Sequence, residues 1–360
     1  FAVVQPEVSG AKHAEIYAER ICSALTGTYD INGYEVVSTA SVGVAVAPQH
    51  GTSAAQLLRS ADVALHQVKL SGSNAIGIYT SDLDDLLKRR LTLQADLRKA
   101  FENEWFSLHY QPQYNLKTRR LTGFEALLRM EHPDRGFISP AEFIPVAEEI
   151  GLIVPLGEWI LYEACRTAVK WPNDITLSVN LSPAQFRRGD MPQIVENVLR
   201  QTQLASRRLG IEITEGLLME SSQSVLHQLQ EIRELGVALA LDDFGTGYSS
   251  LSYLWQFAFD TIKIDRSFVN ALGSGTNVES LLQSIISIGQ SLDLRVVAEG
   301  VENAEQAHFL MANSCRHVQG FLFGRPVPED SVMAIIEKDT RNAENMLAEP
   351  ARPSRHTVAA

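Results

Sequence analysis

Hydrophobic and polar positions alternate most regularly from Phe106 to about Lys338. Short β-rich apolar segments alternate there with longer segments whose apolar residues have helical spacing. The predicted strands are Phe106–Tyr114, Leu121–Met130, Ile175–Leu181, Leu209–Ile213, Val237–Leu241, Thr261–Ile264, Arg295–Ala298 and Val318–Leu322. The predicted helices include Pro140–Ile150, Glu158–Lys170, Met191–Gln201, Ser222–Leu235, Glu279–Leu292 and Ala304–Met311. This alternation predicts an α/β fold, a TIM-like (β/α)8 barrel.

Only the short segment NLKTRR, from Asn115 to Arg120, separates the first two predicted strands. Parallel neighbours need a crossover connection of a dozen or more residues, so this segment is too short for a parallel pair. The two strands are therefore predicted to form a hairpin. The barrel is expected to contain one antiparallel strand.

The first 80 residues carry a mixed pattern that predicts a separate α+β domain. His13–Leu25 and Ala54–Leu70 have helical spacing. Val36–Val46 is nearly continuous in small apolar residues and is predicted to be one buried strand. Ala75–Tyr79 is predicted to be a closing strand.

The charged segment from Asp82 to Trp105 has leucines at helical spacing and predicts an amphipathic helix. The expected organisation is then a first domain at 1–80, a linker helix at 81–104 and the barrel at 105–340. From Asp339 onward the sequence is polar, rich in Ala, Pro and Arg, and without periodicity. Residues 341–360 are therefore expected to be a disordered tail.

Composition is that of a globular protein, with 45% hydrophobic and 21% charged residues among 360. The net charge of −12 argues against a nucleic-acid polymer or an anionic membrane surface as a partner, because either would require a basic stripe. No apolar run reaches the length of a membrane span, and no signal peptide is recognisable, so a cytoplasmic location is expected. Because the chain starts at Phe1 rather than Met, the native N-terminus is expected upstream, where a membrane anchor is compatible with these observations. Three widely spaced cysteines are expected to be buried free thiols.

Polar residues recur at one place in the barrel pattern, which is the end of each predicted strand. They are Glu125, Asn180, Glu212, Asp242, Asp243, Lys263, Glu299 and Gln319. Any one of them alone is readily explained as a strand-terminating or helix-capping residue. Strand ends converge on one face of a barrel, however, where such folds place their active sites. These side chains are therefore predicted to form one site.

Five carboxylates on one face would repel one another and could not all ionise without cations. Divalent metal ions bound through oxygen resolve this conflict. Because the candidates include no His or Cys, Mg²⁺ or Mn²⁺ is favoured over Zn²⁺. The adjacent acids Asp242 and Asp243 suit two ions with one bridging carboxylate, the arrangement used for in-line phosphoryl displacement.

The segment DDFGTGYSS continues from this pair of acids and contains two glycines, which permit positive φ angles. Taken alone, it is typical of an ordinary tight turn between a strand and a helix. Beside two candidate ligands, it is predicted to position ligands or to move on binding.

At these residues the chain closely resembles the EAL family of cyclic di-GMP phosphodiesterases, from about Phe106 to Pro328. Nine motifs in order carry the resemblance, which makes it far more specific than a lone EAL tripeptide. They are YQPQ at Tyr110–Gln113, EALLR at Glu125–Arg129, SPAEFIPVAEEIGLI at Ser139–Ile153, SVNLS at Ser178–Ser182, IEITE at Ile211–Glu215, DDFGTGYSSL at Asp242–Leu251, KIDRSFV at Lys263–Val269, AEGVE at Ala298–Glu302 and QGFLFGRP at Gln319–Pro326.

The resemblance implies roles for the site residues. The ligands implied for a first metal ion are Glu125, Asn180, Glu212 and Asp242. Those implied for a second are Asp242, Asp243 and Glu299. A water between the ions would attack phosphorus while hydrogen-bonded to Lys263, and Glu299 stays open between ligand and general base.

The resemblance also implies the substrate contacts and the product, linear pGpG. Arg129 would meet the phosphates. Gln111, Gln319 and Glu302 would line the substrate groove. Glu215 would anchor the loop Asp243–Ser250, which in such proteins communicates with the interface of a homodimer.

The N-terminal half resembles the C-terminal part of a GGDEF domain, which is diguanylate cyclase-like. TASVGVAVAPQHG at Thr39–Gly51 and ADVALHQVKLSGSN at Ala61–Asn74 carry the resemblance. FAVVQPE, from Phe1, resembles the sequence that follows the Gly-Gly-Asp-Glu signature. That signature and everything before it are absent, so a truncated domain without cyclase activity is expected.

Two other functions compete with an active phosphodiesterase. A module that senses cyclic di-GMP without cleaving it would be expected to lack some metal ligands, whereas every expected ligand type is present. A metal-dependent barrel that acts through enolates would not need the DDFGTGYSS loop or the KID segment. The leading hypothesis is therefore a cyclic-di-GMP-specific phosphodiesterase that uses two Mg²⁺ or Mn²⁺ ions and forms a homodimer through its barrel.

Overall fold

The computed structural model describes residues 1–31, 33–70, 74–219, 223–246, 257, 259–274 and 277–348. The chain consists of two compact units, Phe1–Asp96 and Leu97–Ala360. Within the described ranges, no helix has the length and apolar character needed to cross a bilayer. The three cysteines are free thiols, of which Cys165 and Cys315 are buried as expected, whereas Cys22 is partly exposed.

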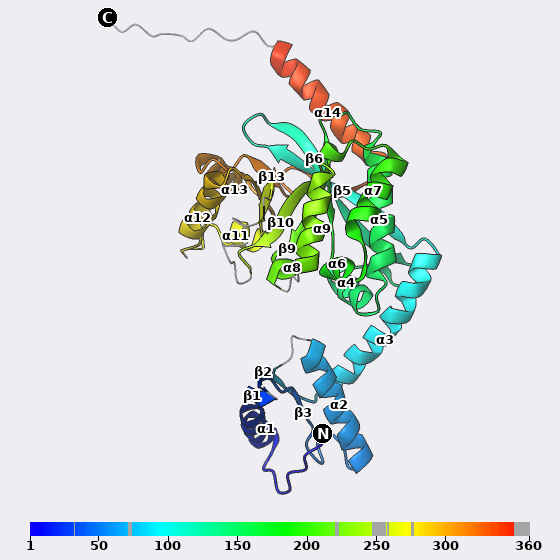
Figure 1. Cartoon of the computed structure of the whole chain (residues 1–360), viewed down its shortest axis with the longest axis vertical. Helices are drawn as coiled ribbons and strands as arrows, with labels where there is room; N and C mark the ends of the chain where they lie inside the picture. Colours follow the sequence, from blue (N-terminus) through cyan, green and yellow to red (C-terminus); the bar gives the residue numbers. More distant parts are fainter. Residues whose placement is uncertain are drawn as a thin grey trace, which may run out of the picture. The chain divides into compact units, whose positions relative to one another are not determined.

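The first unit is built from small sheets with helices packed on them. Its elements are α1 (Ala11–Leu25), β1 (Gly27–Ile31), β2 (Tyr34–Ser38), β3 (Val42–Val44), α2 (Ala54–Leu70), β4 (Ile76–Ile78) and most of α3 (Ser81–Glu102). Strands β1 and β2 form an antiparallel hairpin, and β3 pairs in parallel with β4. Helices α1 and α2 contact β3 and β4 (Figure 1).

The prediction of one buried strand from Val36 to Val46 is wrong. The segment is divided between β2 and β3, and Val37 in β2 is 72% exposed. The small residues Thr39–Ser41 separate the two strands. Because β2 pairs with β1 rather than with β3, its valines lie outside the small core of this unit.

The second unit is a closed barrel. Its strands are β5 (Phe106–Asn115), β6 (Arg120–His132), β7 (Gly136–Ile138), β8 (Thr176–Asn180), β9 (Leu209–Thr214), β10 (Ala238–Phe244), β11 (Thr261–Ile264), β12 (Arg295–Ala298), β13 (His317–Gln319) and β14 (Val327–Pro328). Their order is β14-β5-β13-β12-β11-β10-β9-β8-β6-β7, and the additional pairing of β5 with β6 closes the ring. This confirms the predicted TIM-like barrel.

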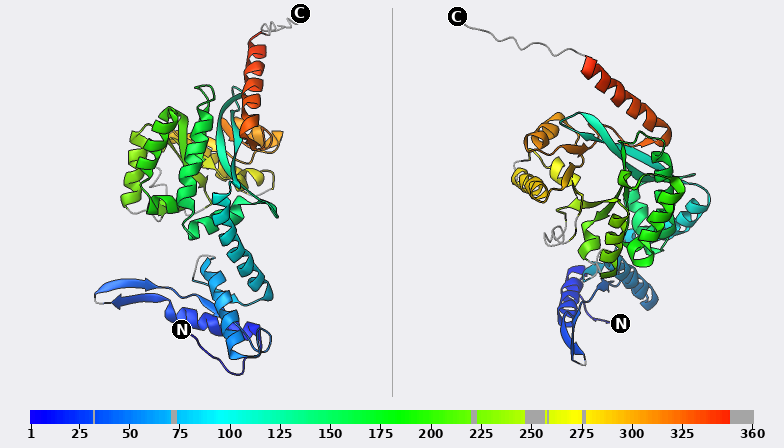
Figure 2. Two further views of the ribbon diagram at one scale, coloured as in Figure 1. Left: turned by 90° about the vertical axis from the view of Figure 1, so that its right-hand side faces the viewer. Right: turned by 45° about the horizontal axis from the view of Figure 1, so that its top comes forward.

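Helices surround the strands of this barrel (Figures 1 and 2). They are α4 (Pro140–Glu149), α5 (Ile153–Ala168), α6 (Pro183–Arg188), α7 (Met191–Thr202), the 3-10 turn η1 (Ser206–Arg208), α8 (Glu215–Met219), α9 (Gln223–Glu234), α11 (Arg266–Asn270), α12 (Val278–Ser291), α13 (Ala304–Ala312) and α14 (Glu329–Ala348). Most match the predicted helices within a few residues. Helices α5, α9, α12 and α14 pack against barrel strands, which is how such a barrel buries its hydrophobic surface.

Strand β5 runs antiparallel to both of its main neighbours, β6 and β13, whereas the strands from β6 through β8 to β13 are parallel. This confirms the predicted hairpin. On the outer side of the hairpin, Tyr110 and Phe124 are buried against Trp171, with ring centroids 5.6 and 5.0 Å from it. The long hairpin and α14 lie side by side (Figure 2).

The last predicted strand, Val318–Leu322, is shorter than expected, because β13 ends at Gln319. A Cβ atom on Gly320 would lie 2.1 Å from the Val301 carbonyl oxygen, so the backbone passes very close to that loop. The Leu322 N–H donates to the same oxygen instead of to a neighbouring strand. The chain therefore turns at Gly320 and places Phe321 and Leu322 at the surface.

The predicted start of the disordered tail, at residue 341, is wrong. Helix α14 continues to Ala348, and residues 349–360 lie outside the described part of the chain. The segment is polar but contains good helix formers. Asp339 is buried and accepts hydrogen bonds from the Leu121 N–H (3.1 Å) and Arg120 Nε (2.9 Å). These bonds tie the helix to the start of β6.

We predict that Asp339→Ala lowers the free energy of unfolding of the barrel by about 2 kcal/mol, because a buried N–H and a guanidinium lose their acceptor. Urea unfolding followed by tryptophan fluorescence reports the barrel, since all four tryptophans lie in the second unit. Glu337→Ala, an exposed position on the same helix, serves as the control. Equal midpoints for the two variants would contradict this anchoring role.

Candidate active site

The carboxyl ends of the barrel strands carry the predicted site residues. Glu125 lies on β6, Asn180 ends β8, Glu212 lies on β9, Asp242 and Asp243 lie on β10, Lys263 lies on β11 and Glu299 follows β12. The parallel register sets Asn180 opposite Glu212 on the neighbouring strand. The Glu299 N–H donates to the Ile264 carbonyl at 3.1 Å, which extends the pairing of β11 with β12 by one step. The fold therefore brings these residues together.

The ammonium of Lys263 lies among four carboxylates. Its Nζ is 2.5 Å from Glu212 Oε2, 2.6 Å from Glu299 Oε1, 3.3 Å from Asp242 Oδ1 and 3.5 Å from Glu125 Oε2. The lysine side chain is only 1% exposed. A buried ammonium is costly unless it is paired, and here each acid comes from a different strand.

In this cluster the pKa of Glu125 is shifted in the opposite direction to the pKa values of Glu212 and Glu299. Burial alone would lower the pKa of Lys263, but the four surrounding carboxylates hold it well above its ordinary value. Burial and the charges of Glu125 and Asp242 raise the pKa of Glu212 well above its ordinary range and that of Glu299 to about 7, although Lys263 opposes both shifts. The pKa of Glu125 is lowered, because Lys263 and hydrogen bonds from Gln319 and Asn180 outweigh its burial.

Two amide side chains donate to Glu125. Asn180 Nδ2 lies 2.6 Å from Oε1, and Gln319 Nε2 lies 2.5 Å from Oε2. Gln319 Nε2 also donates to Gln111 Oε1 at 3.0 Å. Gln111 and Gln319, which were expected to line the substrate groove, are 8% and 4% exposed and bond to each other. In the structure Gln319 donates to the Glu125 carboxylate, and Gln111 accepts from Gln319.

Sequence reasoning missed Gln113, whose Nε2 donates to Gln319 Oε1 at 3.0 Å. The signal was present in YQPQ, because residues two apart on a strand share one face. Gln111 and Gln113 therefore point to the same side of β5, and both reach Gln319. The sequence YQPQ could therefore have predicted that β5 contributes two glutamines to the site.

Asp243 has a positive φ of 53°, an uncommon conformation for a residue other than glycine. Its N–H donates to Asp242 Oδ1 at 2.9 Å, and burial together with the Asp242 charge raises its pKa. The strand thus ends in a bend that sets the two acids side by side. Of the predicted loop Asp243–Ser250, residues 247–250 lie outside the described residues. Glu215, its expected anchor, is buried at the start of α8 directly after β9.

Arg129 lies four residues beyond Glu125 on β6, on the same face of the strand. It is half-buried, and burial lowers its pKa while the Glu125 charge opposes the shift. Glu302 is exposed in the loop before α13, where its N–H donates to Gln306 Oε1 at 2.7 Å. Arg129 is therefore close enough to Glu125 to interact with it, while Glu302 lies at the surface.

The donor set fits a hard divalent cation, because it consists of carboxylate and amide oxygens at one end of the barrel. In the part of the chain that the structure describes, however, no three or more His, Cys, Asp or Glu side chains are arranged around a common metal position. The Lys263 ammonium lies at the point that the four carboxylates share. A metal ion bound by these acids would therefore share their oxygens with Lys263.

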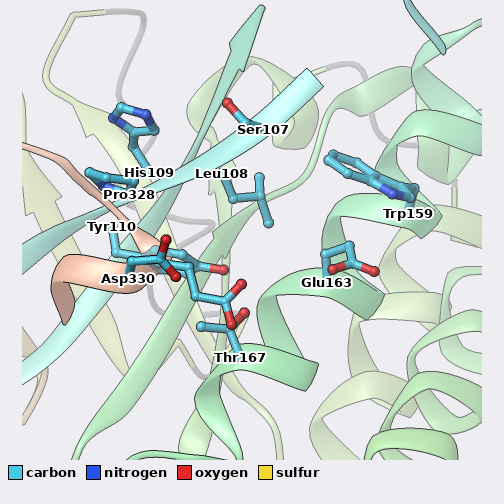
Figure 3. Close-up of a pocket in the computed structure, with 10 residues that line it drawn as sticks. Ser107, Leu108, His109, Tyr110, Trp159, Glu163, Thr167, Pro328 and Asp330 are labelled. Carbon is cyan, nitrogen blue, oxygen red and sulfur yellow. The ribbon is translucent and has the colours of Figure 1, made fainter. Parts of the chain in front are cut away.

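A cavity of about 340 Å³ lies elsewhere, between β5, β14 and the helices α5 and α14 (Figure 3). Because β5 is followed by a hairpin rather than by a helix, no helix of its own covers this part of the strand. Trp159, Glu163 and Thr167 line the cavity from α5. Glu163 is paired with Arg166 at 2.6 Å, and Glu329 with Lys170 at 2.5 Å. None of the predicted site residues lines this cavity, and its two glutamates already have partners.

Comparison with protein families gives two matches. The EAL domain matches residues 94–326. The family described as diguanylate cyclase, GGDEF domain, matches residues 1–75. Both agree in position with the segments that carry the resemblances in the sequence.

Individual relatives agree with these matches. The bifunctional diguanylate cyclase/cyclic di-GMP phosphodiesterase MucR of Pseudomonas aeruginosa is 38% identical over 327 residues, which cover 90% of this chain and 48% of the relative. The cyclic di-GMP phosphodiesterase PdeR of Escherichia coli is 37% identical over 317 residues, which cover 87% of this chain and 48% of the relative. The chain thus spans about half the length of these curated relatives. A solved structure described as the PaMucR phosphodiesterase in complex with c-di-GMP is 41% identical, has a TM-score of 0.65, and covers 67% of this chain and 99% of that chain.

We predict that Glu299 makes stability depend on pH when metal is withheld with EDTA. Its folded pKa of about 7 lies above the ordinary 4.5, so its protonation stabilises the fold fully below pH 4.5. That contribution is lost as pH rises to 7, which amounts to about 3 kcal/mol. Urea unfolding of the wild type and of Glu299→Gln across this range measures the difference. Parallel pH profiles for the two proteins would show that the shift is absent.

Proposed function

The chain belongs to the EAL domain family, and from this premise we propose that its barrel hydrolyses cyclic di-GMP to linear pGpG in a reaction that depends on Mg²⁺ or Mn²⁺. In this reaction a water oxygen forms a bond to phosphorus, the bond from phosphorus to the 3′ oxygen breaks, and the 3′ oxygen leaves with a proton. The named phosphodiesterases among the relatives and the cyclic di-GMP complex of a similar barrel support the choice of substrate.

One observation carries the proposal, which is the convergence of four carboxylates around one buried lysine at the end of the barrel, with Asp243 next to one of them. Fewer charges would be enough to hold these strands together. Burying this many costs stability. Carboxylates from neighbouring strands can hold two divalent ions next to each other, an arrangement used for in-line phosphoryl displacement. We propose Glu125, Asn180, Glu212 and Asp242 for one ion, and Asp242, Asp243 and Glu299 for the other.

The chain's own side chains have distinct tasks in the proposed reaction. When bound, the two ions supply Lewis-acid charge that lowers the pKa of the attacking water and neutralises the phosphate. Lys263 donates to the attacking water and holds it in line with the leaving oxygen. Glu299, whose Oε1 lies 2.6 Å from Lys263 Nζ, is proposed either to bind the second ion or to accept the proton of the attacking water.

Substrate binding is proposed to involve Arg129 and Glu302. Arg129 shares the inward face of β6 with Glu125, so its guanidinium is suited to contact a phosphate bound beside the metal ligands. Glu302 is exposed in the loop before α13, and we propose that it accepts from the edge of a guanine base. Gln111 and Gln319, which are buried, are proposed to line the floor of the substrate groove.

A homodimer formed through the barrel remains part of the proposal. Gly245 has a φ of 95°, and a Cβ atom there would lie 2.9 Å from the Phe268 ring on α11. The bend after Asp243 therefore packs closely against α11. Glu215, at the start of α8, is proposed to anchor this bend and to connect it with the dimer interface.

We expect the purified chain to convert cyclic di-GMP to linear pGpG with Mg²⁺ or Mn²⁺ and to stop when EDTA is added, because the carboxylates need the ions to act. Chromatography of the products measures both. Binding of intact cyclic di-GMP without cleavage under either metal would identify a sensor instead. Turnover that is unaffected by EDTA would contradict the metal dependence.

We expect Lys263→Ala to lower kcat more than it weakens substrate binding, because the ammonium acts at the attacking water. Steady-state kinetics at saturating Mn²⁺ separate kcat from KM. Lys170→Ala, which removes a lysine paired with Glu329 away from the site, is the matched control. Asp242→Ala, which removes a ligand, should eliminate turnover altogether. A Lys263→Ala variant that changes only KM would argue against the assigned role.

A further inference from the structure

Three glutamines form a chain of hydrogen bonds that ends at Glu125. Gln113 Nε2 donates to Gln319 Oε1 at 3.0 Å. Gln319 Nε2 donates to both Gln111 Oε1 at 3.0 Å and Glu125 Oε2 at 2.5 Å. Gln111 Nε2 in turn donates to the Gly324 carbonyl at 3.3 Å. In the Gln319 amide, the nitrogen therefore donates to two acceptors and the oxygen accepts from one donor.

A glutamine amide can point either end toward a neighbour, and its surroundings decide which. The Gly324 carbonyl can only accept, so the nitrogen of Gln111 faces it and the oxygen of Gln111 faces Gln319. That oxygen requires the nitrogen of Gln319. On the other side, the Gln113 nitrogen donates to the oxygen of Gln319. The contacts of both neighbours thus agree with one orientation, in which the Gln319 nitrogen faces Glu125.

The reverse orientation would bring the Gln319 oxygen against the Glu125 carboxylate. Two acceptors at this distance repel, and the carboxylate would rotate away or lose one of its two amide donors. Asn180 holds only the other oxygen, Oε1. The position of Oε2, the oxygen that also faces Lys263, therefore depends on which way Gln319 points.

The antiparallel strand makes this arrangement possible. In the register of β5, Gln111 lies opposite Glu125 on β6, and Gln113 lies opposite Gln319 on β13. The two glutamines are two residues apart and share the inward face of the strand. One strand therefore contacts both the metal-ligand candidate and the residue that holds it.

We propose that Gln113 is a positioning residue that fixes the amide orientation of Gln319 and, through it, the Glu125 carboxylate for metal binding. The inference rests on the proposed function, because it takes Glu125 as a metal ligand. Gln113 touches neither metal nor substrate. Partners that orient metal ligands in this way typically contribute 10–100-fold to metal affinity.

Mn²⁺ binding to the whole chain, measured by electron paramagnetic resonance without substrate, tests the proposal. Gln113→Met keeps the length of the side chain but removes the donor, and we expect about 10-fold weaker binding. Gln113→Glu presents an acceptor to the Gln319 oxygen and should weaken binding further. Gln201→Met, an exposed glutamine at the end of α7, is the matched control and should bind as the wild type does. Saturating Mn²⁺ should restore the turnover of Gln113→Met but not that of Asp242→Ala.

A double-mutant cycle separates positioning from general packing. If Gln113 acts through Gln319, Gln113→Met should have almost no further effect on Mn²⁺ affinity in a Gln319→Met background. Effects that add in full, or a wild-type affinity in Gln113→Met, would overturn the role of Gln113 and leave the proposed function intact. A wild-type chain that binds no Mn²⁺ would overturn both. If Gln113→Met fails to give the wild-type tryptophan spectrum, the isosteric Gln113→Glu takes its place in the cycle.

Discussion

Lys263 contacts acids from four different strands or strand ends, and the candidate site depends on this set of ion pairs. Without a cation, the carboxylates of Glu125, Glu212, Asp242 and Glu299 would repel one another in a buried setting. The ammonium is almost fully buried and lies within 3.5 Å of all four. The same contacts join the ends of β6, β9, β10 and β12 to β11. The lysine that offsets part of the negative charge of the site therefore also links the ends of five strands.

The antiparallel strand β5 is the second constraint. Because a hairpin replaces the first crossover helix, β5 can present glutamines to Glu125 on one side and to Gln319 on the other. The same replacement leaves β5 without a crossover helix of its own, and a cavity lies between this strand, α5 and α14. Helix α14 packs against β5 and β6, and Asp339 fixes it at the start of β6. One departure from the regular barrel thus accounts for several local features.

Local sequence predicted most of the barrel because its strands and helices have strong, simple periodicity. The hairpin followed from loop length alone, since six residues cannot hold a crossover helix. Predictions failed where a neighbour distant in sequence decided the outcome. Val36–Val46 was divided because β2 pairs with β1, and β13 ended at Gln319 because the backbone at Gly320 meets Val301. Helix α14 continued past residue 340 because Asp339 has partners on β6.

For the candidate site, the residue order was enough to predict the chemical types and their place at strand ends, because a side chain's identity and its position on a periodic element are local properties. It also predicted that carboxylates would converge, since parallel strands in a barrel end on one face. The folded arrangement was needed to show which oxygen contacts Lys263, why Glu125 and Glu299 have opposite pKa shifts, and which end of the Gln319 amide faces Glu125. Those properties depend on burial and on partners up to 208 residues apart, which no local pattern encodes.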